Sequence, residues 1–102
     1  MAAKEQTDRR AADIVSDRLA DIAALRQTAQ AGNAQAQNDW GVLYYLGQDV
    51  PQDDVEAEKW FLLAEKQGFK FAVETRAHMR NALTPEQLRE AQRRADAFIP
   101  RP

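Results

Sequence analysis

Four carboxylates crowd into one short stretch of the chain, and they form its densest cluster of side chains that could do chemistry. They are Asp49, Asp53, Asp54 and Glu56. Such a cluster could bind a cation, but calcium loops alternate their ligands around an obligatory glycine, and the segment QDVPQDDVE does not. Carboxylates also cap helices and are stabilised at a helix N-terminus. The pattern therefore favours the start of a helix over a cation site.

Residues for other kinds of catalysis are sparse. His78 is the single histidine and the chain has no cysteine, so the sequence offers no histidine pair for a metal and no thiolate. Ser16 has no histidine near it, which argues against a serine nucleophile. Gly41 and Gly47 lack the Lys-Ser/Thr pair that a phosphate-binding loop requires. We therefore predict no catalytic residue, no metal and no cofactor, and we expect that the protein is not an enzyme.

Charge and hydropathy limit the classes of partner. The 102 residues suit a single domain, and a net charge of -2 gives no general attraction to nucleic acid or to an anionic membrane. Three arginines near the C-terminus make a small basic stripe, but acidic residues interrupt it. The N-terminus is charged from Lys4 onward and resembles no secretory signal, and no stretch is long enough to span a bilayer. We expect a cytoplasmic protein that binds neither nucleic acid nor membrane.

The elements that would position any site are two amphipathic helices between residues 31 and 68. In the first, expected over residues 34–46, apolar residues recur at steps of three and four. Gly41 interrupts this helix at a cost of roughly 1 kcal/mol relative to alanine. Close approach of the second helix is the expected reason. Gly47 is placed to end the helix in a left-handed conformation, and Asp49 tolerates positive φ in the turn that follows.

The second helix is expected to begin at a cap supplied by Asp53 or Asp54, and Asp53 with Glu56 has capping-box spacing. It carries Ala57, Trp60, Phe61 and Ala64 at helical spacing and stops at Gly68.

This hairpin resembles a Sel1-like repeat, a relative of the tetratricopeptide repeat. The residues that match the pattern of that family are Gly32, Ala36, Gly41, Leu43, Tyr44, Gly47, Val50, Asp53, Ala57, Trp60, Ala64 and Gly68. Trp40, Asp49 and Glu65 depart from it, and Glu65 bears on how tightly another repeat could stack. The resemblance implies an α-solenoid element that mediates contact between proteins and has no catalytic residues of its own.

The flanking segments read as incomplete copies of the same unit. A shift of thirty-six residues relates Leu25 to Phe61 and Ala36 to Ala72, a period typical of helical solenoids. We expect an N-terminal helix from Thr7 or Asp8 to Gln30, with an apolar stripe of Val15, Leu19, Ile22, Leu25 and Ala29. After Gly68, a degenerate helix keeps Phe71, Ala72, Met79 and Leu83 at apolar spacing.

A final helix opens at Thr84-Pro85-Glu86-Gln87, with threonine as the cap and Gln87 at the capping-box position. Its predicted packing face is Leu88, Ala91, Ala95, Phe98 and Ile99. This opening is also similar to the C-terminal cap that follows many Sel1-like repeats.

The predicted fold is therefore all-α: a short α-solenoid of antiparallel helix pairs, with about five helices and one well-formed repeat between capping helices. We expect a single domain over residues 1–102. Residues 1–31 supply the N-terminal capping helix, 32–68 the Sel1-like repeat, and 69–102 the degenerate repeat helix and the C-terminal capping helix.

A candidate binding surface lies on the first helix of the hairpin. Asn38, Val42 and Tyr45 recur at steps of four and three, away from the packing positions. In solenoids of this type such residues line the concave surface, where apolar and aromatic side chains anchor a partner. The alternative is that the N-terminal helix covers Val42 or Tyr45. The predicted polar rim of the surface is Gln35, Gln48 and Arg76.

Two functions follow from this interpretation. The first is an adaptor that binds a peptide or another protein on its concave face. The second is a homo-oligomerising module, in which the same patch, or the aromatic residues Phe69 and Phe71, pairs with a second copy.

Overall fold

The computed structural model describes residues 17–102, and within that range the chain is helical and contains no strand. A helix over residues 17–30 is followed by α2 (Ala34–Leu46) and α3 (Asp54–Lys66). Then come α4 (Lys70–Met79), the 3-10 turn η1 (Arg80–Ala82) and α5 (Pro85–Asp96). The expectation of an all-α fold with about five helices is confirmed. The part of the N-terminal helix expected before residue 17, Val15 included, lies outside the described residues.

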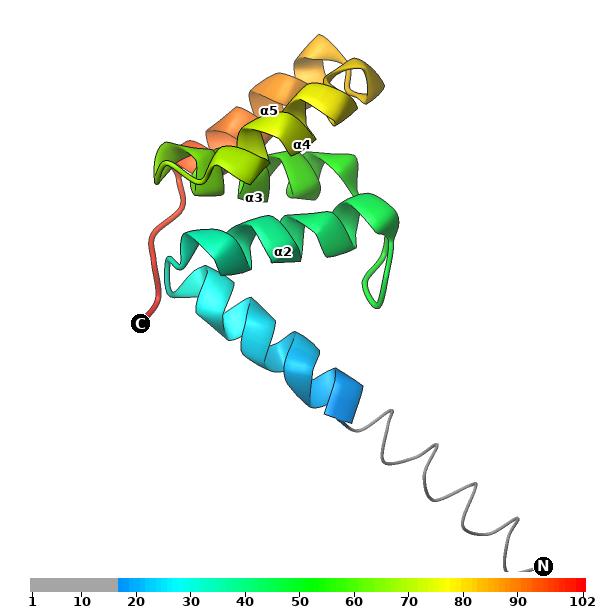
Figure 1. The fold of residues 1–102 in the computed structure, drawn as a ribbon. Helices are drawn as coiled ribbons and strands as arrows, with labels where there is room; N and C mark the ends of the chain where they lie inside the picture. Colours follow the sequence, from blue (N-terminus) through cyan, green and yellow to red (C-terminus); the bar gives the residue numbers. More distant parts are fainter. Residues whose placement is uncertain (1–16) are drawn as a thin grey trace, which may run out of the picture.

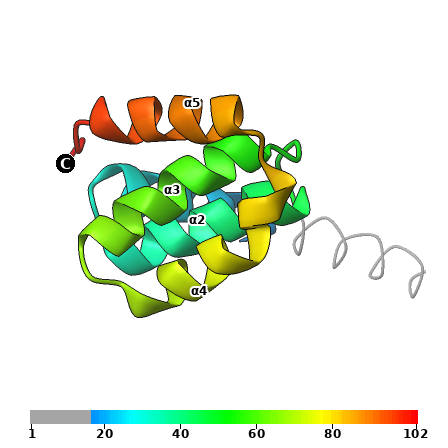
Figure 2. The same ribbon diagram turned by 90° about the horizontal axis from the view of Figure 1, so that it is seen from above.

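The helices stack in chain order as far as α3, and the last two then pack on the side of α3 that faces away from α2 (Figure 1). Seen from above, α4 and α5 flank α3 on opposite sides (Figure 2). α3 therefore contacts α2, α4 and α5. Because it is surrounded in this way, α3 supplies two of the four largest fully buried side chains of the described residues, Phe61 and Glu58.

Local capping explains where the hairpin helices begin and end. The Asn33 side chain accepts a hydrogen bond from the Ala36 backbone N–H at 2.8 Å, so α2 has an N-cap that the sequence analysis did not assign. Gly47 ends α2 with φ 68°, and Asp49 also has positive φ, at 65°. Both expectations for this turn are confirmed.

Asp53 caps α3 by accepting a hydrogen bond from the Glu56 backbone N–H at 3.0 Å. The Glu56 side chain does not complete a reciprocal capping box. It pairs instead with Lys59 and Arg94. At α5 the capping box between Thr84 and Gln87 is complete, as predicted.

Two apolar clusters share α3 between them. Trp60 and Leu63 face Trp40 on α2 and Ala29 on the N-terminal helix. Phe61, which follows Trp60 in the sequence, faces the opposite way. It packs toward Met79 and the other buried residues of α4 and of the turn after it. The two adjacent aromatic residues of α3 therefore hold the molecule together in different directions.

Gly41 occupies the closest approach of α2 and α3. A Cβ atom at this position would lie 2.8 Å from Cε1 of Phe61 and 3.2 Å from the Ala57 carbonyl oxygen. The packing reason expected for this glycine is therefore present. The nearest obstacle is a buried ring, and the backbone carbonyl comes second.

Some residues that were expected to pack are exposed. Phe71 on α4 is 66% exposed, Ile99 after α5 is 78% exposed, and Leu19 on the N-terminal helix is 62% exposed. Their assignment to packing faces was wrong. Phe71 and Ile99 lie on sides of α4 and of the tail that no other described helix covers.

The C-terminal tail returns to the start of the hairpin. The Arg101 backbone N–H donates a hydrogen bond to the Gln30 carbonyl oxygen at 2.7 Å. Pro100 lies 3.6 Å from the position that a Cβ atom on Gly32 would take. Figure 1 shows the C-terminus beside the turn that joins the N-terminal helix to α2.

Among the described helices, none is long and apolar enough to cross a membrane.

Candidate partner-binding surface

The predicted surface on α2 is built by helical spacing. Gln35, Asn38, Val42 and Tyr45 are separated by three, four and three residues, so they follow one face of the helix. Gln35 is exposed and Tyr45 is 38% exposed, while Val42 is half-buried and packs against the Phe61 cluster. This face therefore presents one accessible aromatic ring above a partly covered aliphatic side chain.

Asn38 is more deeply placed than its neighbours on this face. It is 8% exposed, and its Oδ1 atom is buried without a hydrogen-bond partner among the described residues. A buried amide oxygen that lacks a donor carries a desolvation cost. A rearrangement that offers it an N–H group would remove that cost.

The described part of the N-terminal helix packs on another side of α2. Ile22 and Leu25 pack against the cluster that contains Trp40, together with Leu43 and Tyr44. Within residues 17–30, the helix therefore stabilises the side of α2 that carries the packing residues. Tyr45 retains its exposure in the presence of this helix.

Two residues that extend this face were missing from the sequence prediction. Leu46 is 59% exposed and lies one helical turn beyond Val42, and Asp39 is exposed one turn beyond Gln35. The same i to i+4 rule that selected Val42 from Asn38 would have selected both.

The remaining rim residues have different surroundings. Gln48 is exposed in the turn after α2, and its backbone N–H donates to the Leu43 carbonyl oxygen. Arg76 is half-buried on α4, and its guanidinium donates to Glu58 at 2.6 Å and also to Glu65. Arg76 therefore fastens α4 to α3, a role that the sequence analysis did not foresee.

The pKa of Arg76 reflects this environment. Burial lowers the pKa of the guanidinium, but the hydrogen bonds to Glu58 and Glu65 outweigh that effect and raise it above its ordinary value. The group stays charged, and its charge is compensated by α3.

The four clustered carboxylates have structural partners. Asp49 accepts hydrogen bonds from Arg18 at 2.8 and 3.0 Å, Asp53 caps α3, and Asp54 accepts from Gln52. Among the described residues, no three His, Cys, Asp or Glu side chains are grouped so that they could hold a metal ion. Asp53 caps α3 and Asp54 and Glu56 lie in its first turn, as the capping interpretation predicts, whereas Asp49 pairs with Arg18 instead.

Comparison with known families identifies the hairpin. The sequence model of the family described as Sel1 repeat matches residues 34–69, which span α2, α3 and the turn into α4. The chain contains a Sel1 repeat. No curated protein and no solved structure matches it.

The match confirms the resemblance and the helical-repeat architecture together. Sel1 repeats generally mediate contact between proteins, and the family is a non-enzymatic interaction module. In this repeat, Gly41, Trp40 and the buried alanines have packing roles. Side chains available for contact are therefore those on the outer surface.

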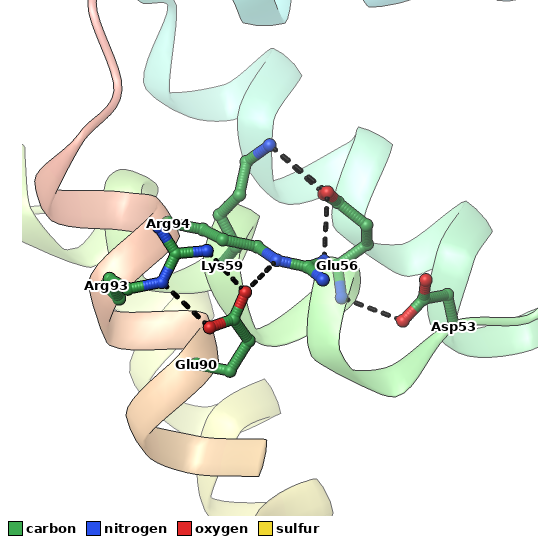
Figure 3. A network of polar contacts seen from close by, with 6 residues as sticks. All are labelled: Asp53, Glu56, Lys59, Glu90, Arg93 and Arg94. Carbon is green, nitrogen blue, oxygen red and sulfur yellow. Dashed lines mark hydrogen bonds and ion pairs between the residues drawn. The ribbon is translucent and has the colours of Figure 1, made fainter. Parts of the chain in front are cut away.

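A second polar cluster lies outside the repeat's α2 face. Glu90 on α5 accepts hydrogen bonds from Arg93 at 2.6 and 2.8 Å and from Arg94 at 3.0 Å. Arg94 also reaches Glu56 on α3 at 3.3 Å, so the cluster links the two helices (Figure 3). These hydrogen bonds lower the pKa of Glu90 from 4.5 to about 2.

This shift predicts a specific acid dependence. Because the pKa of Glu90 is lower in the folded chain than in the unfolded one, the stability that it supplies is present above pH 4.5 and is lost as the pH falls toward 2. We expect the melting temperature of the Glu90→Gln variant to fall less steeply with acid in this window than that of the wild type. Thermal melts by circular dichroism measure it.

The control for this prediction is Glu86→Gln, an exposed carboxylate on the same helix. Its acid dependence should follow the wild type. Parallel curves for wild type and Glu90→Gln would contradict the lowered pKa. Added salt should reduce the difference, since the cluster is accessible to solvent.

Proposed function

We propose that the protein is an adaptor module that binds a peptide or another protein on the concave face of its helical stack, with the face of α2 as the contact surface. The observation that supports this proposal is Tyr45. It is the aromatic side chain of the Sel1 repeat that stays accessible while its aromatic neighbours, Trp40 and Tyr44, pack inward. Aromatic residues of this kind are enriched among the anchors of protein interfaces.

The composition of the face supports the same proposal. Val42, Tyr45 and Leu46 form an apolar centre, and Gln35 and Asp39 are polar and exposed beside it. An apolar centre with a polar rim is the usual anatomy of a specific interface. Asn38 adds a buried amide oxygen that lacks a donor among residues 17–102. We further propose that residues 1–102 act as one domain in this role.

The test is a substitution on this face. Tyr45→Ala is expected to weaken partner binding by about 1–3 kcal/mol, or roughly 5- to 150-fold, because it removes the central anchor. Helicity should stay unchanged, because Tyr45 is not a core residue. Affinity capture from the source cell, followed by quantitative mass spectrometry and titration of the captured protein, measures both effects.

Phe71→Ala is the matched control, since it removes an exposed ring from α4, and Phe71 is 66% exposed against 38% for Tyr45. A partner retained by Phe71→Ala and lost by Tyr45→Ala supports the proposed surface. Binding that Tyr45→Ala leaves intact would refute it.

Self-association is the second candidate. Phe71 on α4 is 66% exposed, and its ring centroid lies 5.8 Å from that of Phe69, which is half-buried in the turn before the helix. A second copy could cover that pair. Light scattering over a dilution series measures the molar mass of the wild type and of Phe71→Ala, which here removes the contact under test. A wild type that is strictly monomeric at the highest concentration removes this candidate.

A further inference from the structure

The proposed function leaves unused a hollow of about 480 Å³ between α3, α5 and the C-terminal tail. We call it the α3–α5 hollow. Its wall includes Lys59 and Trp60 from α3, Arg93 and Arg94 from α5, and Ile99 and Arg101 from the tail. No α2 residue lines it, so it is separate from the surface that contains Tyr45. Its volume lies in the range of sites that bind small ligands and single side chains.

The net charge around the hollow is positive, whereas that of the whole chain is negative. Lys59, Arg93, Arg94 and Arg101 bring four positive charges, whereas Glu56 in the wall and Glu90 beside it bring two negative ones. The local excess is two positive charges in a protein whose net charge is -2. A partner drawn to this place is therefore anionic.

Three of the four cations, Lys59, Arg93 and Arg94, are held in position before any partner arrives. Glu90 binds Arg93 and Arg94, and Glu56 binds Arg94 and Lys59, so each carboxylate fixes two cations (Figure 3). Arg93 uses Nε and Nη2 for Glu90, which leaves its Nη1 donors uncommitted. Arg101 makes no side-chain ion pair within the described part of the chain, and its backbone N–H holds the tail in place. Fixed donors bind an anion at a lower ordering cost than mobile ones.

An apolar surface adjoins these donors. The Trp60 and Phe98 rings meet edge to face with their centroids 5.5 Å apart, and Ile99 is 78% exposed beside them. The indole Nε1 of Trp60 is buried without a hydrogen-bond partner in the described chain. An aliphatic side chain therefore has a surface to cover.

We propose that the α3–α5 hollow is a second binding site, which takes an acidic peptide segment with an aliphatic residue between its carboxylates. The carboxylates pair with Arg93 and Arg101, and the aliphatic side chain covers Phe98 and Ile99. Charge complementarity selects this occupant. A continuous phosphate backbone fits less well, because Glu56 and Glu90 interrupt the positive surface.

The test uses a fluorescein-labelled peptide, Gly-Asp-Glu-Leu-Glu-Asp-Gly, and its neutral analogue with Asn and Gln in place of the acids. Fluorescence anisotropy should show saturable binding of the acidic peptide and none of the analogue. Arg101→Glu should weaken binding by about tenfold or more, because it replaces an uncommitted guanidinium with a like charge. The Arg101 backbone hydrogen bond is kept, so the fold is retained.

Arg89→Glu is the matched control. It makes the same charge change at an exposed position of α5 outside the wall, and its affinity should stay within about twofold of wild type. In nitrogen–proton NMR spectra, the acidic peptide should shift the indole signal of Trp60 and leave that of Trp40 in place. The missing peak of a Trp60→Phe variant assigns the signal.

Several results would overturn the proposal. They are equal binding of the neutral analogue, equal losses for Arg101→Glu and Arg89→Glu, a shift of the Trp40 indole alone, or tighter binding of a single-stranded oligonucleotide of the same charge. Tyr45→Ala should bind the acidic peptide as the wild type does. Failure of this site therefore leaves the proposed α2 surface untouched, and the reverse also holds.

Discussion

Phe61→Ala is expected to lower the free energy of unfolding by about 3–5 kcal/mol, which is the largest effect that a single substitution should produce in this chain. Phe61 is 0% exposed and is the centre of the cluster that joins α3 to α4. Its ring also contacts the glycine surface of α2 at Gly41. Truncation therefore leaves a cavity at the point where three helices meet, and close-packed helices around it relax only in part.

Urea denaturation followed by far-ultraviolet circular dichroism measures this change. Domains of this kind have about 5–15 kcal/mol of stability in total, so the variant should lie close to its unfolding transition. Phe71→Ala makes the same chemical change at a position that is 66% exposed, and it should cost less than about 1 kcal/mol. Similar losses for the two variants would show that Phe61 is not the centre of the core.

Arg76→Met is expected to cost about 2–4 kcal/mol, the second largest effect. The Glu58 side chain is 2% exposed, and the substitution removes a guanidinium that donates to it at 2.6 Å. A buried carboxylate that loses a charged donor keeps its desolvation cost and loses part of its compensation. The lower end of the range allows for the 29% exposure of the Arg76 side chain.

A double variant separates the contribution of the ion pair to the free energy of unfolding from the contribution of side-chain packing. Glu58→Leu combined with Arg76→Met should recover most of the stability, since two apolar groups of similar size leave no uncompensated charge. Glu65→Gln removes only the outer, 32% exposed partner and should cost about 0–1 kcal/mol. Urea titrations of the wild type, Glu58→Leu, Arg76→Met and the double variant give the coupling energy between the two positions, and strictly additive losses would contradict a direct pair.

The hairpin could be predicted from sequence because its signals are local. Gly47, Asp49 and Asp53 have turn and capping chemistry that needs no knowledge of the rest of the fold. Gly41 was informative for a similar reason, since a glycine inside a helix has a cost that only close packing explains. The complete capping box at Thr84 belongs to the same class.

Positions that depend on neighbours could not be predicted. Phe71 and Ile99 follow the apolar spacing of their helices, yet that spacing does not reveal whether another helix lies opposite. The same limit applies to Arg76, which was predicted to lie at a polar rim. Its ion pairs with Glu58 and Glu65 were not foreseen, because these partners come from another helix. Asn38 was chosen by its spacing on α2, and its burial depends on tertiary packing.

The α3–α5 hollow shows how a correct observation can be interpreted too narrowly. The arginines of α5 were recognised as a basic stripe, and the intervening acids were taken as evidence against nucleic-acid binding. In the fold, Arg93 and Arg94 both donate hydrogen bonds to Glu90, so one carboxylate fixes the positions of two cations. The interruption by acids still argues against a long polyanion, but it is compatible with a short acidic segment.

The return of the C-terminal tail has a consequence for how the molecule comes apart. In an open helical array each unit touches its sequence neighbours alone, so the ends can melt while the middle survives. Here the hydrogen bond from Arg101 to Gln30 joins the C-terminal tail to the last residue of the helix over residues 17–30. Loss of the tail therefore removes a contact from the N-terminal helix, and this link between segments distant in sequence favours a single all-or-none transition.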